Sequence, residues 1–580
     1  MENSEIAARL AEIAALMEFD GEPFFKTKAY ERAARSVEDA GQPVRDMLAA
    51  GTIETLAGVG SAIAKKIDAI QTTGTCKYLE ELRAKFPPTI VELLSVPGIG
   101  AKTAISLYQE LGIAGIDDLR KAVAARMLVK IPRLGPKTIA SLESALARMS
   151  FGPRRMRLGQ AWELSHAIAR ALRESGTVNC VAVAGSVRRM EPTVGDLDII
   201  CTSPDATQAL EAFSALPMVA RVSQRGISKG TIVAGPGISV DCRVVPDRCF
   251  GNLLQHFTGS KEHNVKLREY AKRRGLKVSE NGIEDRERRV VTATEEAAVY
   301  EALGMQFIPP ELRVGLDEID LARKHAIPEL VALGDIRGEL HAHTDWSDGR
   351  RSIEEMARAA AQRGREYLSI SDHSQGRSVA GGLTAARLQE HTVSVRSASE
   401  KYGVRLFASS EVDIRADGSM DFPDEVLRQL DIVVGSIHSG FAGSKDKQTR
   451  RLLRAIANPY VNIVGHPTGA ILEGRAGYEF DADAVFEAAA RNGTALEINA
   501  NPARLDLNAA LARRAFELGC TIAIDSDAHD FEDMDNLRFG VGTARKAGLT
   551  KAAVLNTRSA DDVMAFVRAK RDKGESVRRS

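Results

Sequence analysis

Residues 184–200 read AGSVRRMEPTVGDLDII, and residues 239–245 read SVDCRVV. Asp196 and Asp198 alternate along a predicted strand, so both carboxylates project from the same face. Asp241 lies on a second predicted strand and can complete a site of three carboxylates. Such a site can hold two Mg²⁺ ions, which activate a hydroxyl group and stabilise a leaving pyrophosphate. The pattern predicts an α+β unit that transfers nucleotides.

The segment before these carboxylates is suited to bind a triphosphate. Gly185 and Ser186 offer a backbone N–H group and a hydroxyl, and Arg189 can neutralise phosphate charge. A lone Asp-x-Asp pair is more often the solvated end of a strand. Its combination with Gly-Ser and with a third strand aspartate favours the catalytic interpretation.

The surrounding sequence predicts the rest of this unit. Apolar alternation predicts strands at 178–184, 197–201, 230–233 and 239–245. Helices are expected at 151–175 and near 251–274, and residues 314–334 are expected to form a mostly helical connector.

Residues 1–150 are predicted to form short helices separated by glycine turns. Two segments, LAGVGSAIAKKI (56–67) and VPGIGAKTAISLY (96–108), place a Gly-apolar-Gly turn before a helix. Glycines there let backbone N–H groups at the helix start face a phosphate. The alternative is a plain packing unit, which two copies make less favourable. A third copy, IPRLGPKT (131–138), is degenerate because Arg133 replaces the first glycine.

The C-terminal part repeats strand-like runs with helices between them. Seven such runs predict a parallel (β/α)7-type barrel, related to the eight-unit barrel: 338–343, 367–371, 405–409, 432–436, 461–464, 495–498 and 521–524. The basic tail from Lys570 onward is expected to be frayed.

Histidines and carboxylates gather at the ends of these predicted strands. Ligands at the C-terminal ends of barrel strands converge on one mouth, which predicts a metal centre. His391 falls inside a helical stretch and is interpreted as an ordinary residue. The nine candidate ligands are His341, His343, Asp348, His373, Glu411, His438, His466, Asp527 and His529.

Composition restricts the class of protein. The 580 residues are 44% hydrophobic and 27% charged, which is typical of a globular chain with several domains. No apolar run is long enough to span a membrane, and six sparse cysteines without a CxxC pair predict a reduced, cytoplasmic protein. Residues 101–280 hold 27 Lys and Arg against 16 Asp and Glu, which favours a polyanionic partner.

Residues 20–313 resemble the family X DNA polymerases, the DNA polymerase beta group. The resemblance rests on LAGVGSAIAKKID, VPGIGAKTA, GSVRR with GDLD, VDCRVV, FTGS (257–260) and PPELR (309–313). It implies helix-hairpin-helix contacts with the DNA backbone through these residues: Gly58, Gly60, Gly98, Gly100 and Lys102.

The same resemblance implies roles around the carboxylates. Arg243 is expected beside them, and His256 stands where the family usually has a tyrosine that helps to exclude ribonucleotides. Asn264 and Arg268 would line the nascent base pair. The residues implied to bind the incoming nucleotide are Gly185, Ser186, Arg189, Gly259, Ser260, Asn264 and Arg268.

The resemblance also covers a deoxyribose-phosphate lyase pocket. Lys66 falls on the Schiff-base position, and Lys26 and Tyr30 fall on positions that contact phosphate. Ala62 replaces a phosphate-binding lysine of the relatives, so the pocket is incomplete. The alternative, in which Lys66 only contacts the DNA backbone, stays open.

Residues 335–570 resemble the PHP (polymerase and histidinol phosphatase) family through HAHTDWSDG, SDH, GHP and SDAH. That family carries a three-metal phosphoesterase site, and all nine ligand positions are filled here. Mixed imidazole and carboxylate ligands suit Mn²⁺ or Zn²⁺, whereas Mg²⁺ or Mn²⁺ is expected at the aspartates.

We therefore expect a multidomain DNA polymerase that fills short gaps in DNA repair and trims 3′ ends with a metal-dependent exonuclease. Its partners would be gapped or primed DNA and dNTPs, and the chain would be a monomer without membrane contact. One alternative is a PHP nuclease or phosphatase whose polymerase half only binds DNA, and another is a non-catalytic DNA scaffold. The expected domains are a lyase-like domain (1–85), helix-hairpin-helix fingers (86–150), palm and thumb (151–313), a connector (314–334) and the PHP domain (335–573).

Overall fold

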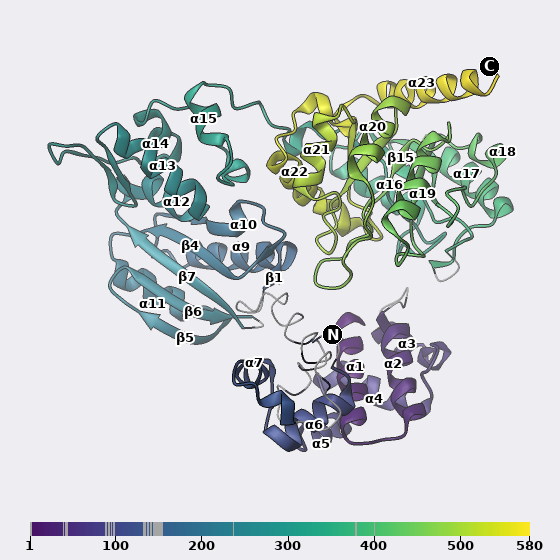
Figure 1. Cartoon of the computed structure of the whole chain (residues 1–580), viewed down its shortest axis with the longest axis horizontal. Helices are drawn as coiled ribbons and strands as arrows, with labels where there is room; N and C mark the ends of the chain where they lie inside the picture. Colours follow the sequence, from purple (N-terminus) through teal and green to yellow (C-terminus); the bar gives the residue numbers. More distant parts are fainter. Residues whose placement is uncertain are drawn as a thin grey trace. The chain divides into compact units, whose positions relative to one another are not determined.

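The computed structural model describes residues 3–38, 44–86, 99–130, 155–235, 237–377, 380–399 and 401–579, with a few single residues between 40 and 142. The chain divides into two compact units, Met1–Phe151 and Gly152–Ser580 (Figure 1). Each unit is described by itself below. The degenerate third hairpin lies outside the described residues, apart from Gly135.

The first unit is helical throughout its described part. In the first helix Ile6, Leu10, Ile13 and Met17 recur on one face and are buried, as an amphipathic helix requires. Apolar side chains from the later helices pack against these four residues in one buried cluster. The α-helices are α1 (Asn3–Phe19), α2 (Phe24–Glu38), α3 (Val44–Ala49), α4 (Ser61–Thr73), α5 (Lys77–Arg83), α6 (Ala101–Leu111) and α7 (Ile116–Ala124).

The second unit contains, near its start, a five-stranded sheet in the order β2-β4-β7-β6-β5, which we call the palm. Leu197, Ile199 and Cys201 point from β4 into a core with α9 (Leu158–Glu174) and α11 (Ala206–Ser214). Ile200 points to the opposite face, toward Leu253. The strands are β2 (Cys180–Val183), β4 (Asp196–Thr202), β5 (Val219–Arg225), β6 (Lys229–Ala234) and β7 (Ile238–Val245).

The thumb follows the palm. The helical run near 251–274 contains α12 (Phe250–Thr258) and α13 (Lys261–Arg273), with the Ser260 side chain capping the second helix. A small antiparallel sheet of β8 (Lys277–Ser279), β9 (Gly282–Glu284) and β10 (Val290–Val291) completes it together with α14 (Glu296–Ala302). Neither this sheet nor β5 is predicted from apolar alternation, because these strands are short or expose most of their side chains.

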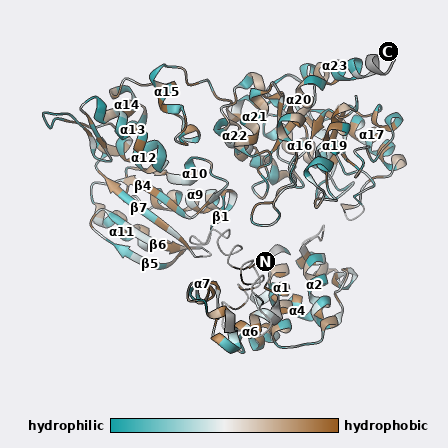
Figure 2. Ribbon diagram, viewed as in Figure 1, coloured by the Kyte–Doolittle hydropathy of each residue, from teal (hydrophilic) through white to brown (hydrophobic). Residues whose placement is uncertain are grey.

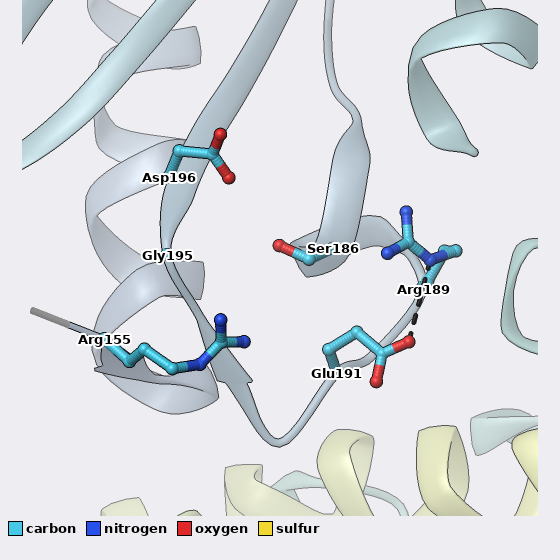
Figure 3. Close-up of a pocket in the computed structure, with 6 residues that line it drawn as sticks. All are labelled: Arg155, Ser186, Arg189, Glu191, Gly195 and Asp196. Atoms are coloured by element: carbon cyan, nitrogen blue, oxygen red, sulfur yellow. Dashed lines mark ion pairs between the residues drawn. The ribbon is translucent and has the colours of Figure 1, made fainter. Parts of the chain in front are cut away.

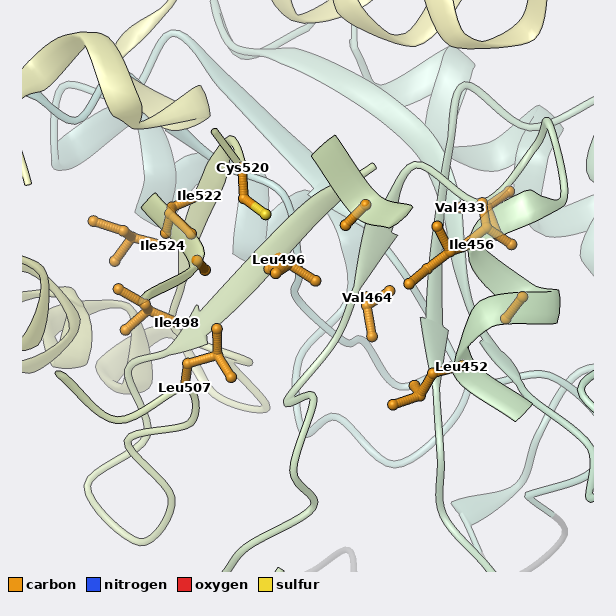
Figure 4. Packing of buried hydrophobic residues seen from close by; sticks show 14 of the residues in the cluster. Val433, Leu452, Ile456, Val464, Leu496, Ile498, Leu507, Cys520, Ile522 and Ile524 are labelled. Carbon is orange, nitrogen blue, oxygen red and sulfur yellow. The ribbon is translucent and has the colours of Figure 1, made fainter. Parts of the chain in front are cut away.

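Seven parallel strands in the order β11 to β17 form the C-terminal barrel, whose packed apolar side chains appear in Figure 4. An isolated bridge between Ala342 and Ala528 links the first strand's loop to the last strand's loop. The strands are β11 (Gly338–Glu339), β12 (Tyr367–Ile370), β13 (Arg405–Asp413), β14 (Ile432–Ser436), β15 (Ile463–Val464), β16 (Ala495–Asn499) and β17 (Ile522–Asp525). The predicted (β/α)7 fold is confirmed.

The first barrel strand is shorter than predicted. It ends at Glu339 instead of residue 343, because the following backbone bonds partly to side chains. The N–H group of Leu340 donates to Asp525 Oδ1 at 2.6 Å, and that of Ala342 donates to Ser371 Oγ at 2.9 Å. The first histidine pair therefore lies in a loop fastened inside the barrel mouth.

Helices surround the barrel, and the last one corrects the expectation of a frayed tail. α23 continues from Ala560 to Arg579 and buries Val563 and Val567 beneath the strands. Lys570 is buried and its Nζ donates to the carbonyl of Ile456 at 2.9 Å, so basic composition alone was misleading. The other long helices are α16 (Ile353–Gln362), α17 (Ala385–Ser399), α19 (Lys445–Ala457), α20 (Ala482–Asn492), α21 (Ala509–Glu517) and α22 (Leu537–Lys546).

Among the residues described, no helix has the length and apolar character needed to cross a membrane. Figure 2 shows hydrophilic residues interspersed along the helices of both units.

Candidate active sites

The three palm aspartates lie on neighbouring strands. β4 and β7 are parallel and pair Asp198 directly with Asp241, while Asp196 lies two residues earlier on β4. Asp241 Oδ1 accepts a hydrogen bond from Thr231 at 2.7 Å, and its Oδ2 lies 2.8 Å from Lys229 Nζ. The three carboxylates predicted from the sequence therefore lie close together in the structure. Lys229, which the sequence had not indicated, supplies a counter-charge.

The electrostatics of this group favour a cation. Burial, together with the carboxylates of Asp196 and Asp241, raises the pKa of Asp198 to about 7. Three carboxylates in one place repel one another, so a divalent ion that relieves the repulsion is favoured. The oxygen-only donor set suits Mg²⁺ or Mn²⁺.

Gly185 makes close approach to the carboxylates feasible. Its φ is +61°, and a Cβ atom there would lie 2.0 Å from Asp198 Oδ2. No side chain other than hydrogen fits this position. The backbone of Gly185 and Ser186 can therefore lie directly against Asp198, next to the proposed metal ligands.

A cavity of about 450 Å³ opens beside Asp196. Figure 3 shows Ser186 and Arg189 facing Asp196 across it, with an ion pair between Arg189 and Glu191. Ser186 Oγ is buried and has no hydrogen-bond partner within the described part of the chain. A polar, cation-lined cavity beside three carboxylates fits a nucleoside triphosphate. Its lining is Arg155, Ser186, Arg189, Glu191, Gly195 and Asp196.

The FTGS segment reaches the same cavity wall. Arg189 donates to the carbonyl of Thr258, and a Cβ atom on Gly259 would lie 3.1 Å from the Arg189 guanidinium. Ser260 caps α13 by accepting from the His263 N–H group. Gly259 and Ser260 thus shape the segment that positions Arg189.

Asn264 and Arg268 lie together on α13. Asn264 Nδ2 donates to the carbonyl of His256 at 2.7 Å, and Arg268 Nε donates to the carbonyl of Asn264 at 3.2 Å. Burial lowers the pKa of His256, which therefore sits in this segment as a neutral group at neutral pH. Arg243 lies over the Phe257 ring, on the same face of β7 as Asp241.

A buried ionic network joins residues 185–189, the segment proposed to bind the triphosphate, to the thumb. Glu296 lies 2.7 Å from Arg188 and 2.6 Å from Arg313, and all three are partly or fully buried. Arg188 also donates to Thr258 Oγ1 at 2.5 Å. The family resemblance drew attention to Arg313 through the motif PPELR. Nothing in the local sequence identified Glu296 as the partner of Arg313.

The first hairpin has the predicted form. Gly58 has a φ of +86°, and its missing side chain lets the turn pack against α2 at Arg32 and Ala33. Gly60 precedes α4 as its N-cap, and Gly100 does the same for α6. Gly98 and the Lys102 side chain lie outside the described residues.

Lys66 borders a cavity of about 630 Å³ in the first unit. Its Nζ lies 5.8 Å from the Tyr30 ring centre and 5.3 Å from that of Tyr78, and donates to the carbonyl of Ala62 at 3.2 Å. Aromatic faces stabilise the charged ammonium. Lys26 Nζ pairs with Glu22 at 3.0 Å, and its charge acts on the Tyr30 hydroxyl, whose pKa burial raises.

In the barrel all nine candidate ligands converge. Eight form three overlapping groups whose ligand atoms lie within 4.8 Å of one another. The ninth, His466, places Nε2 2.8 Å from Glu411 Oε1. The three groups are His343, Asp348, His373 and His529; His341, His343 and Asp527; and His373, Glu411 and His438.

Charges are strongly coupled in this cluster. Although burial opposes it, Glu411 and Asp348 raise the pKa of His373 to about 10. In the same way Asp348 and Asp527 raise the pKa of His529 to about 9. Without bound metal, the imidazoles of His373 and His529 therefore carry protons, and metal binding must release these protons. Buried imidazoles interleaved with carboxylates fit a cluster of transition-metal ions.

A second set of carboxylates orients the ligands, and sequence reasoning missed it. Glu497 accepts from His341 Nδ1 at 2.7 Å, and Asp413 contacts His438 Nδ1 at 2.5 Å. These bonds leave the opposite ring nitrogen facing the cluster. The positions of these residues on or near predicted barrel strands were the only available signal.

His391 is outside the metal groups, as expected. It is buried on α17 and its Nε2 lies 2.9 Å from Asp372 Oδ2. Asp372 also accepts from the side chains of Thr344 and Ser347 at 2.6 Å each. The pair thus fastens the loop that follows the first histidines.

Family models match four parts of the chain. A DNA polymerase beta thumb model matches residues 253–314, and a PHP domain model matches residues 339–501. A helix-hairpin-helix domain model matches residues 1–76, and a SAM-like helix-hairpin-helix tandem model matches residues 90–148. These matches confirm the resemblances to the family X DNA polymerases and to the PHP family, and they confirm the predicted helix-hairpin-helix segments.

Three relatives are informative. The chain is 36% identical over 572 residues, 98% of its length and 100% of the relative's, to the DNA polymerase/3′-5′ exonuclease PolX of Bacillus subtilis (strain 168). It is 33% identical over 231 residues to a probable phosphatase of Thermoanaerobacter sp. (strain X514), and 32% identical over 245 residues to one of Caldanaerobacter subterraneus subsp. tengcongensis. Those matches cover 38% and 40% of this chain and 89% and 91% of the phosphatases.

Proposed function

We infer that this chain, which belongs to the family of the bacterial DNA polymerase/3′-5′ exonuclease PolX, is a DNA-directed DNA polymerase that also degrades DNA 3′ ends. The palm carries the polymerase site and the barrel carries the exonuclease site. The observation that supports this best is the presence of two complete ligand sets in one chain: three aspartates on two paired strands and nine barrel ligands.

In the palm, Asp196, Asp198 and Asp241 would hold Mg²⁺ or Mn²⁺, which lowers the pKa of a primer 3′-hydroxyl and neutralises the pyrophosphate that leaves. Ser186 and the backbone at Gly185 would hold the triphosphate, and Arg189 would offset its charge. Asn264 and Arg268 would contact the nascent base pair. His256 stands at the position of the family tyrosine that helps to exclude ribonucleotides.

In the barrel, the nine ligands would hold up to three Mn²⁺ or Zn²⁺ ions, which lower the pKa of a water nucleophile and neutralise the phosphoryl oxygens. Glu497 and Asp413 would orient the imidazoles by accepting their Nδ1–H bonds. Water would attack the phosphorus of the 3′-terminal phosphodiester, and the P–O3′ bond to the penultimate nucleotide would break. That 3′-oxygen would take up the proton that the water loses, and a nucleoside 5′-monophosphate would leave.

The substrate would be gapped or primed DNA. The hairpin glycines Gly58, Gly60 and Gly100 place helix N-termini where they can contact a DNA backbone without reading its sequence. In DNA repair, the exonuclease would remove a damaged 3′ terminus and the polymerase would then fill the gap. We further propose that the chain acts as a monomer with the domain boundaries expected from its sequence.

A primer-extension assay on a one-nucleotide gap, with separate Mg²⁺ and Mn²⁺ lanes and with or without dNTPs, tests both halves together. We expect extension with dNTPs and Mn²⁺-stimulated shortening without them. Shortening in the absence of any extension would instead support the alternative, a nuclease or phosphatase whose palm only binds DNA. The intact aspartate set argues against that outcome.

A deoxyribose-phosphate lyase is a second candidate activity, supported by the cavity beside Lys66. A Schiff base needs a neutral amine, and the Lys66 amine lies beside the rings of Tyr30 and Tyr78. Borohydride trapping on a nicked abasic duplex decides the matter, with Lys66→Ala compared with Lys65→Ala. Trapping lost only in the Lys66 variant supports the lyase, and no trapping by the native protein supports a role in DNA contact.

A further inference from the structure

Three arginines occupy loops at the carboxyl ends of the barrel strands, where the nine ligands also lie. Arg377 follows β12, Arg475 follows β15, and Arg504 follows β16. Arg504 is the closest to the cluster, because its Nε lies 3.7 Å from Asp527 Oδ2. None of the three belongs to the ligand set, and the chemistry described above does not use them.

Their guanidinium groups retain free donors. Arg504 Nη1 and Arg377 Nε are buried, and neither has a hydrogen-bond partner among the residues that the structure describes. Arg475 is held in place, since its Nε donates to the carbonyl of Gly469 at 2.9 Å and its guanidinium lies 3.7 Å from the centre of the Phe441 ring. Each group presents a planar fork of N–H donors, which matches phosphate oxygens.

The three positive charges act on one another. Burial and the charges of Arg504 and Arg377 lower the pKa of Arg475, opposed by Tyr478 and Asp506. Nearby carboxylates are already engaged: Asp527 accepts from Asn499 at 3.0 Å, and Asp506 accepts from the Thr468 N–H group at 3.0 Å. Like charges with free donors at the edge of a metal cluster favour an anion.

We propose that Arg377, Arg475 and Arg504 bind the phosphate groups of the DNA strand that is shortened in the barrel. Arg504, beside Asp527, contacts the phosphate under attack, and Arg475 and Arg377 contact the adjacent one toward the 5′ side. The inference rests on the proposed exonuclease, and it names the residues that select a phosphodiester chain over a small phosphate ester.

The probe is inorganic phosphate, and calorimetry on the metal-loaded full chain measures its binding. Arg504→Gln, Arg475→Gln and Arg377→Gln are compared with Arg454→Gln, which removes a surface arginine paired with Asp417 at 2.9 Å. We expect phosphate affinity to fall by about tenfold or more for Arg504→Gln, with partial recovery in Arg504→Lys. The KM for a DNA 3′ end should rise in all three, and primer extension should not change.

Elemental analysis separates phosphate binding from a role in metal retention. Unchanged metal content with weakened phosphate binding supports the proposal. Lost metal in Arg504→Gln, with native phosphate affinity in the other two variants, would overturn it, because Arg504 would then only support Asp527. Native affinity in all three variants would overturn it as well. Arginine-dependent phosphate binding without 3′-end degradation would contradict the proposed exonuclease and leave the anion site standing.

Discussion

The palm and the barrel assemble their candidate metal sites in opposite ways. The palm uses three carboxylates on two paired strands beside an open cavity of about 450 Å³, with one lysine as counter-charge. The barrel uses nine ligands that follow the strands of one mouth, six of them imidazoles, and most are buried. A further layer of carboxylates holds the barrel histidines, whereas in the palm Asp241 contacts Lys229 and Thr231.

This difference separates two kinds of metal use. An open, oxygen-only site suits ions that arrive with the substrate's triphosphate and leave with pyrophosphate. A buried site with imidazole donors and oriented ligands suits resident ions that are exchanged slowly. Four predictions test this contrast, beginning with the largest expected effect.

Replacing both Asp196 and Asp198 by Ala should lower primer extension by about three orders of magnitude or more, because no ligand pair remains for the ions. Degradation of 3′ ends should continue at the native rate, and DNA affinity should persist in a gel-shift assay. Glu174→Ala, an exposed change on α9, serves as the control. Normal gap filling by the double variant would show that the catalytic assignment is wrong.

Replacing both His341 and His343 by Ala should remove at least one resident ion and lower exonuclease activity by about two orders of magnitude. Gap filling should persist with longer products. Elemental analysis of purified protein gives the metal content, and His325→Ala, an exposed histidine outside the barrel mouth, is the control. A native protein without Mn, Zn or Fe that leaves 3′ ends intact with added Mn²⁺ would contradict the barrel assignment.

Glu497→Gln should weaken metal retention in the barrel by about 10- to 100-fold, because a neutral amide holds the His341 Nδ1–H group less well. Dialysis against graded chelator followed by elemental analysis measures the loss. Glu487→Gln on the exposed face of α20 should behave like the native protein. Equal retention in both variants would mean that the second layer of carboxylates does not hold the ions.

The smallest effect concerns pH in the palm. The pKa of Asp198 is raised to about 7, so the metal-free carboxyl is protonated below that pH and ionised above it. Extension at limiting Mg²⁺ should therefore fall by about tenfold per pH unit below pH 7, since one proton competes with the ion. Saturating Mg²⁺ should move this acidic limb to lower pH. An identical limb at both concentrations would exclude such competition.

The local sequence was sufficient to predict where candidate site residues lie wherever a residue pattern follows the periodicity or the end of a strand. Asp196 and Asp198 share a face because side chains alternate, and the histidine pairs follow predicted strand ends because parallel strands of a barrel open on one mouth. Gly185 was identified by its position before the carboxylates. Its structural reason, a Cβ clash with Asp198 at 2.0 Å, was visible only in three dimensions.

Sequence alone determined the order of the helix-hairpin-helix, polymerase and PHP parts, the seven barrel strands and the residues of both candidate ligand sets. Tertiary structure decided the partners: Lys229 beside Asp241, Glu296 between Arg188 and Arg313, and Glu497 behind His341. It also decided that Lys570 is buried beneath the barrel instead of frayed. These pairings join residues 12 to 156 positions apart. Periodicity reports which face a side chain occupies, but which charge it meets there depends on how distant segments pack.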